Sequence, residues 1–314
     1  MRVLITGGTG FLGRAIVGAL VARGHTPVVF GRRAATLVAD GHAGVLGEAI
    51  VGDVRDRDAL AAAAHGCDAM IHTAALVSVW RPRARDFDDT NVGGLRHALE
   101  AVHTHGLQRL VYTSSFLALP PAGRTAPLVA NDYQRTKADA AVIAADARDH
   151  GVPIVSMYPG VIYGPGLLSE GNLVGRLIAD HLAGRLPGLL GAQRLWSFAW
   201  VHEVAQAHVA ALDHPNPEPG YQLGGPNLPQ ISPFEVLHAL KGTRLPRQLP
   251  LWTGTPVAWI EEARARLTGR PPQLTRLTLE IFRHDWPMDS TAAERDLAFR
   301  QKKLEEGVAE MVPA

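Results

Sequence analysis

The chain has 314 residues, of which 46% are hydrophobic, so it is long enough and apolar enough for an α/β core with an additional lobe. Its formal charge of +1 gives no general attraction for nucleic acid or for an anionic membrane, so neither is expected as a partner. A single cysteine, Cys67, excludes an internal disulfide framework, and we expect a cytoplasmic protein without a cleavable leader or a membrane span.

Short β-rich runs alternate with helical runs rich in alanine and leucine in the first half of the chain. The expected strands are Val3–Thr6, Pro27–Phe30, Ala49–Val51, Ala69–His72, Arg109–Thr113 and Pro153–Tyr158. The expected helices between them cover 11–23, 56–65, 84–105 and 133–149. This alternation predicts an α/β fold with a Rossmann-type, doubly wound parallel sheet that is covered by helices on both faces.

After about residue 165 the pattern changes to helical runs that are separated by joints rich in proline and glycine. These runs cover 171–184, 202–213, 232–241 and 256–268. We therefore divide the chain into an α/β domain, residues 1–165, and a smaller, mostly helical lobe, residues 166–314. Residues 192–213 and parts of the later chain are expected to return to the first domain.

The first expected strand runs directly into a glycine-rich segment, TGGTGFLG, residues 6–13. A strand before such a loop and a helix after it form the context in which the loop binds a pyrophosphate, with help from the N–H groups of the helix N-terminus. The expected phosphate-binding residues are Gly7, Gly10, Phe11, Leu12 and Gly13. The spacing G-x-x-G-x-x-G departs by one residue from G-x-G-x-x-G, and the alternative is an ordinary glycine turn in a flavodoxin-like protein.

Three residues of the middle of the chain have the potential for acid–base chemistry. Ser115 follows the expected strand 109–113 at its carboxyl end, and Tyr133 and Lys137 are four residues apart on one face of a helix. A tyrosine acts as a general base near pH 7 only if its phenolate is stabilised by roughly 4 kcal/mol. A lysine ammonium one turn away, with an oxidised nicotinamide nearby, would supply much of this. Taken alone, a Tyr-x-x-x-Lys pair is more often a surface pair.

At these positions the chain resembles the extended short-chain dehydrogenase/reductase family. The motifs that carry the resemblance are TGGTGFLG (6–13), GDV (52–54), HTAAL (72–76), NVGG (91–94), YTSS (112–115), the Tyr133/Lys137 pair and YPGVIYGPG (158–166). The chain is similar to the dihydroflavonol-reductase-like branch and, within it, to the plant farnesol dehydrogenases through YTSSFLAL (112–119), GRLPGLLG (184–191), SFAWVHEV (197–204) and RHDW (283–286). The resemblance implies an NAD(P)-dependent alcohol/carbonyl oxidoreductase with a nucleotide-binding first domain and a substrate-binding lobe.

The resemblance also implies roles for individual residues. Catalysis would be carried by Ser115, Tyr133 and Lys137, and the cofactor would in addition be contacted by Asp53, Val54, Ala74, Lys137 and Pro159. Asn91 would support the active-site water and the lysine, and a helix-terminus cap is an equally weighted alternative. The interval between Ser115 and Tyr133 is shorter than in the plant relatives and is expected to line the substrate pocket.

The second expected strand ends without a carboxylate and is followed by Gly31, Arg32 and Arg33. Enzymes that prefer NAD carry an acidic residue here for the ribose 2′-hydroxyl, whereas a guanidinium is well suited to a 2′-phosphate. We therefore expect a preference for NADP(H), bound by Arg32, with NAD(H) as the second option. The alternative is that the two arginines stack on adenine or are only solvated.

Other features predict less specific roles. The fourteen histidines form no pattern typical of metal ligands, so no metal is expected, and His202–Glu203 is interpreted as structural or pocket-lining. Five tryptophans are expected in the core or the pocket wall: Trp80, Trp196, Trp252, Trp259 and Trp286. The expected partner is a small molecule, with the chain a monomer or a homodimer. A nucleotide-sugar epimerase or dehydratase, and a regulator that senses nucleotides, remain the competing functions.

Overall fold

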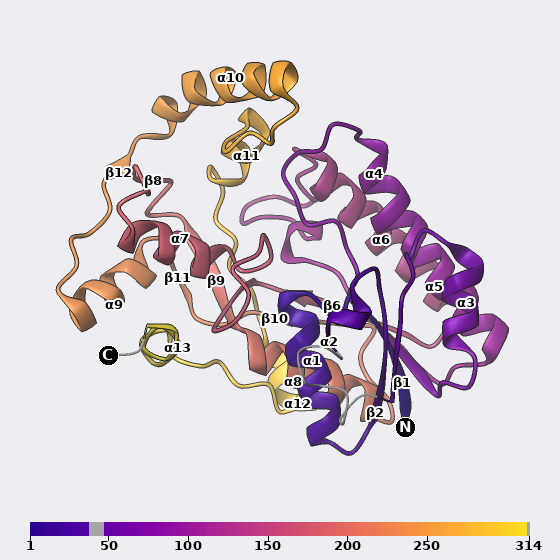
Figure 1. Cartoon of the computed structure of the whole chain (residues 1–314). Coiled ribbons are helices and arrows are strands. Elements are labelled where there is room, and N and C mark those ends of the chain that lie inside the picture. The colour runs from indigo at the N-terminus through magenta and orange to yellow at the C-terminus, as the bar shows by residue number, and fades with distance from the viewer. Residues whose placement is uncertain (38–46, 313–314) are drawn as a thin grey trace.

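The computed structural model describes residues 1–37 and 47–312 and confirms the doubly wound α/β fold (Figure 1). Seven parallel strands form the main sheet in the order β10-β6-β5-β4-β1-β2-β3. Their bounds are Arg2–Thr6 (β1), Thr26–Phe30 (β2), Glu48–Ile50 (β3), Ala69–His72 (β4), Leu110–Thr113 (β5), Ile154–Pro159 (β6) and Gly220–Leu223 (β10). Strand order reverses between β1 and β4, and in sheets of this kind ligands bind outside the carboxyl ends at that point.

Successive residues of the central strands enter two separate cores. In β1, Val3 and Ile5 pack beneath α1, α8 and α12, whereas Leu4 packs beneath α3, α5 and α6 on the other face. The helices of the first face are Phe11–Ala22 (α1), Val201–Asp213 (α8) and Thr291–Leu297 (α12). Those of the second are Arg57–Ala64 (α3), Gly94–His105 (α5) and Asp132–Asp149 (α6). Burial on both faces explains why these strands are almost continuously hydrophobic.

The expected strands and helices of the first half agree with the structure to within one residue at their ends. The expected helix 84–105 is divided into α4 (Arg85–Phe87), a π-helical segment η2 (Asp88–Gly93) and α5. Two further short helices are α2 (Ala34–Leu37) and the 3₁₀ turn η3 (Phe116–Ala118). Bulges of the π type often occur at functional sites, and η2 carries Asn91 towards α6.

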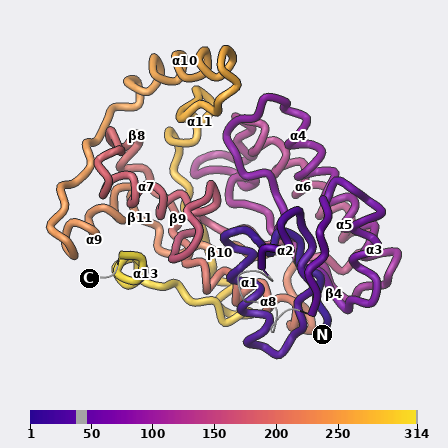
Figure 2. Tube along the Cα trace, viewed as in Figure 1, coloured from indigo at the N-terminus to yellow at the C-terminus, as the bar shows by residue number. Residues whose placement is uncertain are grey.

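The later half contributes more to the main sheet than the sequence pattern indicates. Its strand β10 pairs with β6 at the edge of the sheet and was not expected. The helix α10 begins at Leu251 rather than at residue 256, because Pro256 lies in its second turn and breaks only one hydrogen bond there. Figure 2 shows α8 lying beside α1, on the same face of the main sheet.

The remaining elements lie to one side of the main sheet, and all of them except β12 and α10 contribute to a third hydrophobic core (Figures 1 and 2). Their strands are Val161–Tyr163 (β7), Leu189–Leu190 (β8), Leu195–Trp200 (β9), Asn227–Pro229 (β11) and Gln248–Leu249 (β12). Their helices are Leu173–Leu182 (α7), Ser232–Lys241 (α9), Leu251–Thr268 (α10), Arg276–Ile281 (α11) and Leu304–Met311 (α13). Trp196 and Trp286 are buried there as expected, whereas Trp252 and Trp259 on α10 are exposed, so the expectation for these two was wrong.

The glycine-rich loop between β1 and α1 is folded so tightly that side chains do not fit. Gly7 has a positive φ of 75°, and a Cβ atom there would lie 2.8 Å from the amide nitrogen of Ala74 at the end of β4. A Cβ atom on Gly13 would lie 2.1 Å from the carbonyl oxygen of Gly7. The amide of Gly10 donates to the same Gly7 oxygen at 2.9 Å. The glycines therefore let β1, β4 and α1 approach closely at the reversal of the sheet.

Replacing Gly13 by alanine should lower the free energy of unfolding by roughly 2 kcal/mol, because the loop must move away from the new methyl group. Gly18→Ala on the same helix is the matched control, since a Cβ there meets nothing within 4 Å. It should raise stability by about 0.5–1 kcal/mol. Urea unfolding of both variants measures the difference, and equal stability of the two would contradict this account of the loop.

Candidate active site

Ser115 and Tyr133 meet where β5 ends and α6 begins. Ser115 is buried and starts the turn η3, where its Oγ accepts a hydrogen bond from the amide of Leu117 at 3.2 Å. Asn131 caps α6 by accepting from the amide of Gln134 at 2.8 Å, which places Tyr133 in the first turn. Burial raises the pKa of Tyr133 to about 12, and a hydrogen bond from Ser115 acts in the opposite direction. Of the three predicted catalytic groups, the structure thus brings the hydroxyls of Ser115 and Tyr133 together.

Lys137 lies one turn further along α6 and is buried beneath the same strand end. Its Nζ donates to the carbonyl oxygen of Thr113 at 2.9 Å and lies 5.3 Å from the centre of the Tyr112 ring. Burial lowers the pKa of Lys137 to about 7, because the charged form loses its hydration. Lys137 lies one helical turn from Tyr133, so the expected stabilisation of the phenolate by the charged form of this amine stays a prediction.

A buried histidine that the sequence did not single out for this site fixes the strand end that Lys137 contacts. His208 of α8 has its Nε2 at 2.9 Å from the hydroxyl of Thr113 and its Nδ1 at 2.7 Å from the carbonyl oxygen of Val204. Burial lowers the pKa of His208 to about 4, so the ring is neutral. Because a carbonyl only accepts, Nδ1 carries the proton and Nε2 accepts from Thr113. No local sequence signal connects residues 95 positions apart.

A second buried histidine joins β1 to β4 next to the glycine-rich loop. The amide of Ala74 donates to the hydroxyl of Thr6 at 3.2 Å, and that hydroxyl lies 3.0 Å from Nδ1 of His72. Burial, with the nearby Lys137 as a smaller cause, lowers the pKa of His72 to about 3. The ring is therefore neutral, and its Nδ1 shares a hydrogen bond with the Thr6 hydroxyl. The hydrogen bond from the Ala74 amide to Thr6 holds Ala74 against the loop that is expected to receive the dinucleotide.

Asn91 lies inside η2 and connects three parts of the site. Its Oδ1 accepts from the amide of Leu76 at 2.7 Å, and its Nδ2 donates to the hydroxyl of Thr136 at 3.0 Å. Thr136 directly precedes Lys137 on α6. Because Asn91 is within a helical segment and bonds to other elements, the alternative role as a helix-terminus cap is wrong.

The other predicted nucleotide contacts lie at the carboxyl ends of neighbouring strands. Arg32 is exposed after β2, and Pro159 ends β6. The Asp53 carboxylate accepts from Arg55 at 2.7 and 3.0 Å; this bonding lowers its pKa, and Arg32 lowers it further through its charge. Val54 is buried, and its carbonyl oxygen accepts from Nδ1 of His97 at 2.9 Å. Of these residues, Asp53, Arg55 and His97 border a hollow of about 630 Å³ beside α3 and η2.

The observed loop fits a pyrophosphate. The N-terminus of α1 begins at Gly10 without a side-chain cap, so its first N–H groups are available to an anion, and Cβ atoms at Gly7 and Gly13 would fill the cradle. Arg32 follows β2 and Asp53 follows β3, on the side of β1 away from β4. The cradle, Ala74 and Pro159 therefore suit an extended dinucleotide along this edge of the sheet.

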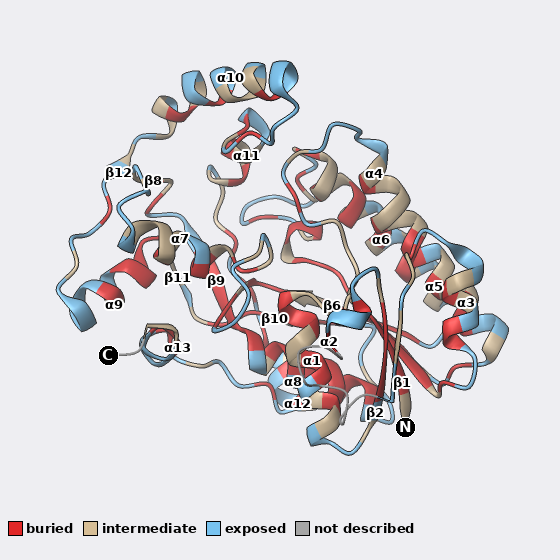
Figure 3. Ribbon diagram, in the orientation of Figure 1, coloured by how far each residue is buried: buried red, intermediate tan, exposed pale blue. Residues whose placement is uncertain are grey.

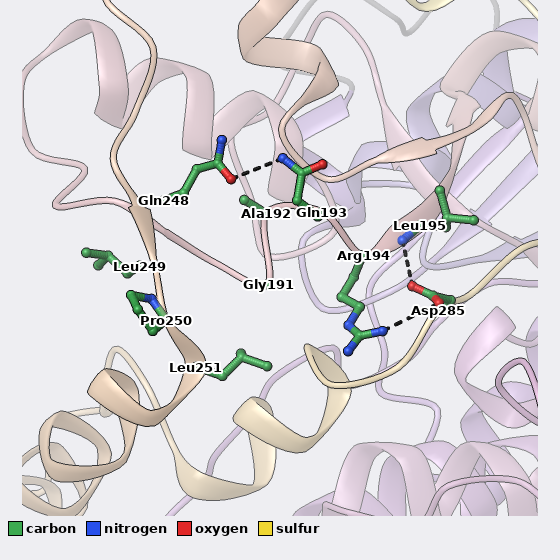
Figure 4. A pocket seen from close by; sticks show the side chains of 10 residues that line it. All are labelled: Gly191, Ala192, Gln193, Arg194, Leu195, Gln248, Leu249, Pro250, Leu251 and Asp285. Atoms are coloured by element: carbon green, nitrogen blue, oxygen red, sulfur yellow. Dashed lines mark hydrogen bonds and ion pairs between the residues drawn. The ribbon is translucent and has the colours of Figure 1, made fainter.

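The segment after Ser115 turns towards the later half of the chain. The Phe116 ring meets the Trp286 ring edge-on at 5.4 Å, and the amide of Ala122 donates to the carbonyl oxygen of Asp285 at 3.0 Å. On the other side of Asp285 lies a hollow of about 490 Å³ (Figure 4). Its lining is Gly191, Ala192, Gln193, Arg194, Leu195, Gln248, Leu249, Pro250, Leu251 and Asp285. The Phe116–Trp286 contact thus makes the neighbourhood of Ser115 aromatic, whereas the hollow beyond Asp285 has both aliphatic and polar side chains.

Within residues 1–37 and 47–312, no three His, Cys, Asp or Glu side chains are grouped so that they could hold a metal ion. Glu203 has a structural contact, since its carboxylate accepts from the amide of Lys302 at 2.9 Å. Among the helices of the same residues, none combines the length and apolar character that crossing a bilayer requires.

The family model of the NAD-dependent epimerase/dehydratase family matches residues 3–224. The chain belongs to this family, which is the extended short-chain dehydrogenase/reductase group that its motifs resemble. It is therefore an NAD(P)-dependent enzyme by family. A relative from Synechocystis sp. that is provisionally named a dihydroflavonol 4-reductase is 26% identical over 98% of this chain and 92% of its own, in agreement with the expected branch.

Two further relatives and one solved structure extend the comparison. Sterol demethylase protein B of Methylococcus capsulatus is 34% identical over 68% of this chain and 66% of its own length. The 3β-hydroxysteroid dehydrogenase/Δ5→4-isomerase of Mycobacterium tuberculosis is 31% identical over 95% of this chain and 85% of its own. The crystal structure of gox2253 superposes with a TM-score of 0.81 at 27% identity, covering 99% of this chain and 96% of that one.

Burial of the Lys137 amine gives a prediction for stability. Its pKa falls from 10.5 to about 7 on folding, so the penalty on the charged form is fully present below about pH 7 and disappears as the pH rises to about 10.5. Lys137→Met should therefore stabilise the cofactor-free protein by on the order of 2 kcal/mol below pH 7, and this gain should shrink towards pH 10.

The exposed Lys303 provides the matched control, and Lys303→Met should change stability little over the same range. Chemical unfolding at several pH values measures both variants. A gain from Lys137→Met that is independent of pH would contradict the burial of a titrating amine.

Proposed function

We propose that the protein transfers hydride between NADP(H) and an alcohol or carbonyl group of a fairly apolar small molecule. The observation that carries this proposal is the contact of the Ser115 and Tyr133 hydroxyls at the carboxyl edge of the sheet, one helical turn from a buried lysine. Residues 1–165 would bind the cofactor and residues 166–314 would form the substrate-binding lobe.

Tyr133 is the proposed general acid and base. In the reductive direction its hydroxyl donates a proton to the substrate oxygen, and in the oxidative direction the phenolate removes it. Ser115 donates a hydrogen bond to the same oxygen and holds it beside Tyr133. The bound nicotinamide supplies or accepts the hydride. A pKa raised to about 12 keeps Tyr133 protonated at neutral pH, which suits the reductive direction.

Lys137 and the residues around it are proposed to position this pair. His208 bonds to the hydroxyl of Thr113 and so fixes this residue, and the carbonyl oxygen of Thr113 orients the Lys137 amine. Asn91 and Thr136 fix the turn of α6 on which Lys137 lies. A positive charge added by an oxidised nicotinamide would lower the pKa of Tyr133 and favour the phenolate that oxidation needs.

The apolar character of the substrate is supported by the walls of the site. Phe116, Leu117 and Trp286 lie on the side of Ser115 that faces the lobe and belong to or pack against its hydrophobic core. Two of the relatives are named for sterol or hydroxysteroid chemistry, which agrees with an apolar substrate of this kind. The interval 116–132 makes part of these walls, so its length would affect which substrate fits.

The competing function is that of a nucleotide-sugar epimerase or dehydratase, which the name of the family covers. Such an enzyme retains its NAD through the whole cycle and needs polar side chains for the sugar diphosphate. Here β2 is followed by Arg32 rather than a ribose-binding carboxylate, and the walls near Ser115 are aromatic and aliphatic. Release of NAD(H) on denaturation, with no consumption of NADPH by any carbonyl, would favour this competitor.

Tyr133→Phe should lower kcat by about 10³-fold in both directions while leaving the affinity for NADPH within a few-fold, because only the proton donor is removed. Tyr163→Phe is the control, since Tyr163 is a buried tyrosine whose ring contacts Phe198 and Trp200 of β9. NADPH oxidation against a panel of prenyl aldehydes, aromatic ketones, steroid ketones and flavanones gives the rates. The oxidative rate of the wild type should rise with pH. Turnover of Tyr133→Phe near the wild-type value would rule out this mechanism.

Arg32→Ser should raise the KM for NADPH by about tenfold or more and leave that for NADH nearly unchanged, because a charge-assisted contact to the 2′-phosphate is lost. Arg33→Ser is the neighbouring control and should have a much smaller effect. Steady-state kinetics with both cofactors measures the preference. A wild-type kcat/KM for NADH equal to or above that for NADPH would show the preference to be wrong.

A further inference from the structure

The helix α10 is attached to the rest of the chain by one narrow side. The buried residues of α10 are Gly254, Ala258 and Ala265. Because these residues are small, the backbone of α10 can approach the neighbouring elements closely. A Cβ atom on Gly254 would lie 2.7 Å from Leu279 of α11 and 2.9 Å from Leu190 of β8. Figure 1 shows α10 at the upper edge of the molecule with α11 beneath it. The opposite side of α10 points away from the protein, except where the Arg276 guanidinium of α11 stacks on the Trp259 ring at 3.6 Å.

That opposite side carries a continuous apolar stripe, which we call the outer face of α10. Its members recur every three or four residues and are Trp252, Pro256, Trp259, Ile260, Ala263 and Leu267. The largest of them are strongly exposed, with 73% for Trp252, 68% for Ile260 and 88% for Leu267. Figure 3 shows much of α10 in the colour of exposed residues. Large side chains in such a stripe mark an interaction surface rather than isolated exposed residues.

The charges around the outer face are mainly positive. Residues 251–283 contain five arginines and three glutamates and no lysine, aspartate or histidine. Each glutamate lies next to an arginine, in the pairs Glu261–Arg264 at 2.7 Å, Glu262–Arg276 at 2.9 Å and Glu280–Arg283 at 3.4 Å. Arg266 and Arg270 belong to none of these three ion pairs, and both are exposed near Leu267 at the end of α10. The outer face itself has no acidic side chain, so it complements a negatively charged partner.

The size and composition of the outer face distinguish between kinds of partner. A stable protein–protein interface takes about 20–30 residues from each side, whereas the outer face has six on one helix. Tryptophan and arginine side chains each combine an apolar body with a polar end, which suits the interfacial region of a bilayer, and the outer face and its end carry both. The overall charge of +1 gave no reason to expect a membrane partner, because it does not reveal the local surplus of arginine over glutamate in residues 251–283.

We propose that the outer face of α10 binds peripherally to the surface of a membrane that contains anionic lipids. Trp252, Ile260 and Leu267 enter the interfacial region, while Arg266 and Arg270 contact lipid phosphates. The helix lies in the plane of the surface and remains attached to α11. This proposal does not depend on the reaction proposed above.

The test is sedimentation of the full-length protein, loaded with NADPH, with vesicles of phosphatidylcholine alone or of equimolar phosphatidylcholine and phosphatidylglycerol. We expect binding to the anionic vesicles and about tenfold weaker binding to the neutral ones, with a loss of binding at high salt. The emission of the exposed Trp252 and Trp259 should shift to shorter wavelength on anionic vesicles only.

The variant Ile260→Gln/Leu267→Gln should bind at least tenfold more weakly than the wild type, and Arg266→Gln/Arg270→Gln should bind anionic vesicles no better than neutral ones. The matched control is Val142→Gln/Leu240→Gln, which removes two side chains that are 70% and 48% exposed on α6 and α9 and should leave binding unchanged. An unchanged melting temperature confirms that each variant is folded. Equal binding of the wild type and Ile260→Gln/Leu267→Gln would overturn the proposal. A wild-type dimer that this variant dissociates would also overturn it, and would assign the outer face to a second copy of the chain.

Discussion

The close contact of the glycine-rich loop with the end of β4 is the constraint on which the rest of the site depends. Gly7 meets the backbone of Ala74, and Thr6 and His72 bond across the same two strands. Because strand order reverses here, α1 and α5 lie on opposite faces of the sheet, and in such sheets ligands bind outside the carboxyl ends at the point of reversal. The cradle for a pyrophosphate and the position of the proposed catalytic groups both follow from that reversal.

The buried Lys137 amine lowers the stability of the folded protein at neutral and acidic pH. An amine without a carboxylate partner among the contacts described is held by one carbonyl oxygen and an aromatic ring, and its pKa falls to about 7. A protein selected for stability alone would place a methionine there. The support that the position receives from Thr113, His208 and Asn91 indicates that the amine is kept for its chemistry. Those three residues come from three different elements, so their cooperation is a property of the fold.

The outer face of α10 and the hydrophobic cores contain the same residue types, which are exposed on the first and buried in the second. Trp196 and Trp286 are buried in the lobe, whereas Trp252 and Trp259 belong to a helix that is attached by one side only. Their sequence surroundings are similarly apolar, and the difference arises because small residues at Gly254 and Ala258 give α10 its only packed side. The membrane contact proposed for the outer face would give these tryptophans an apolar environment that the chain itself does not provide.

The sequence by itself determined the features that depend on neighbours along the chain. Alternating strands and helices predicted the sheet to within one residue in the first half, and the spacing of Tyr133 and Lys137 predicted a shared helical face, because both are set within one or two turns. Only the tertiary structure decided which distant groups meet. His208 reaches Thr113 across 95 positions, β10 joins β6, and the buried Lys137 amine bonds to a backbone carbonyl oxygen of β5. Such contacts depend on burial and long-range packing, which no local pattern encodes.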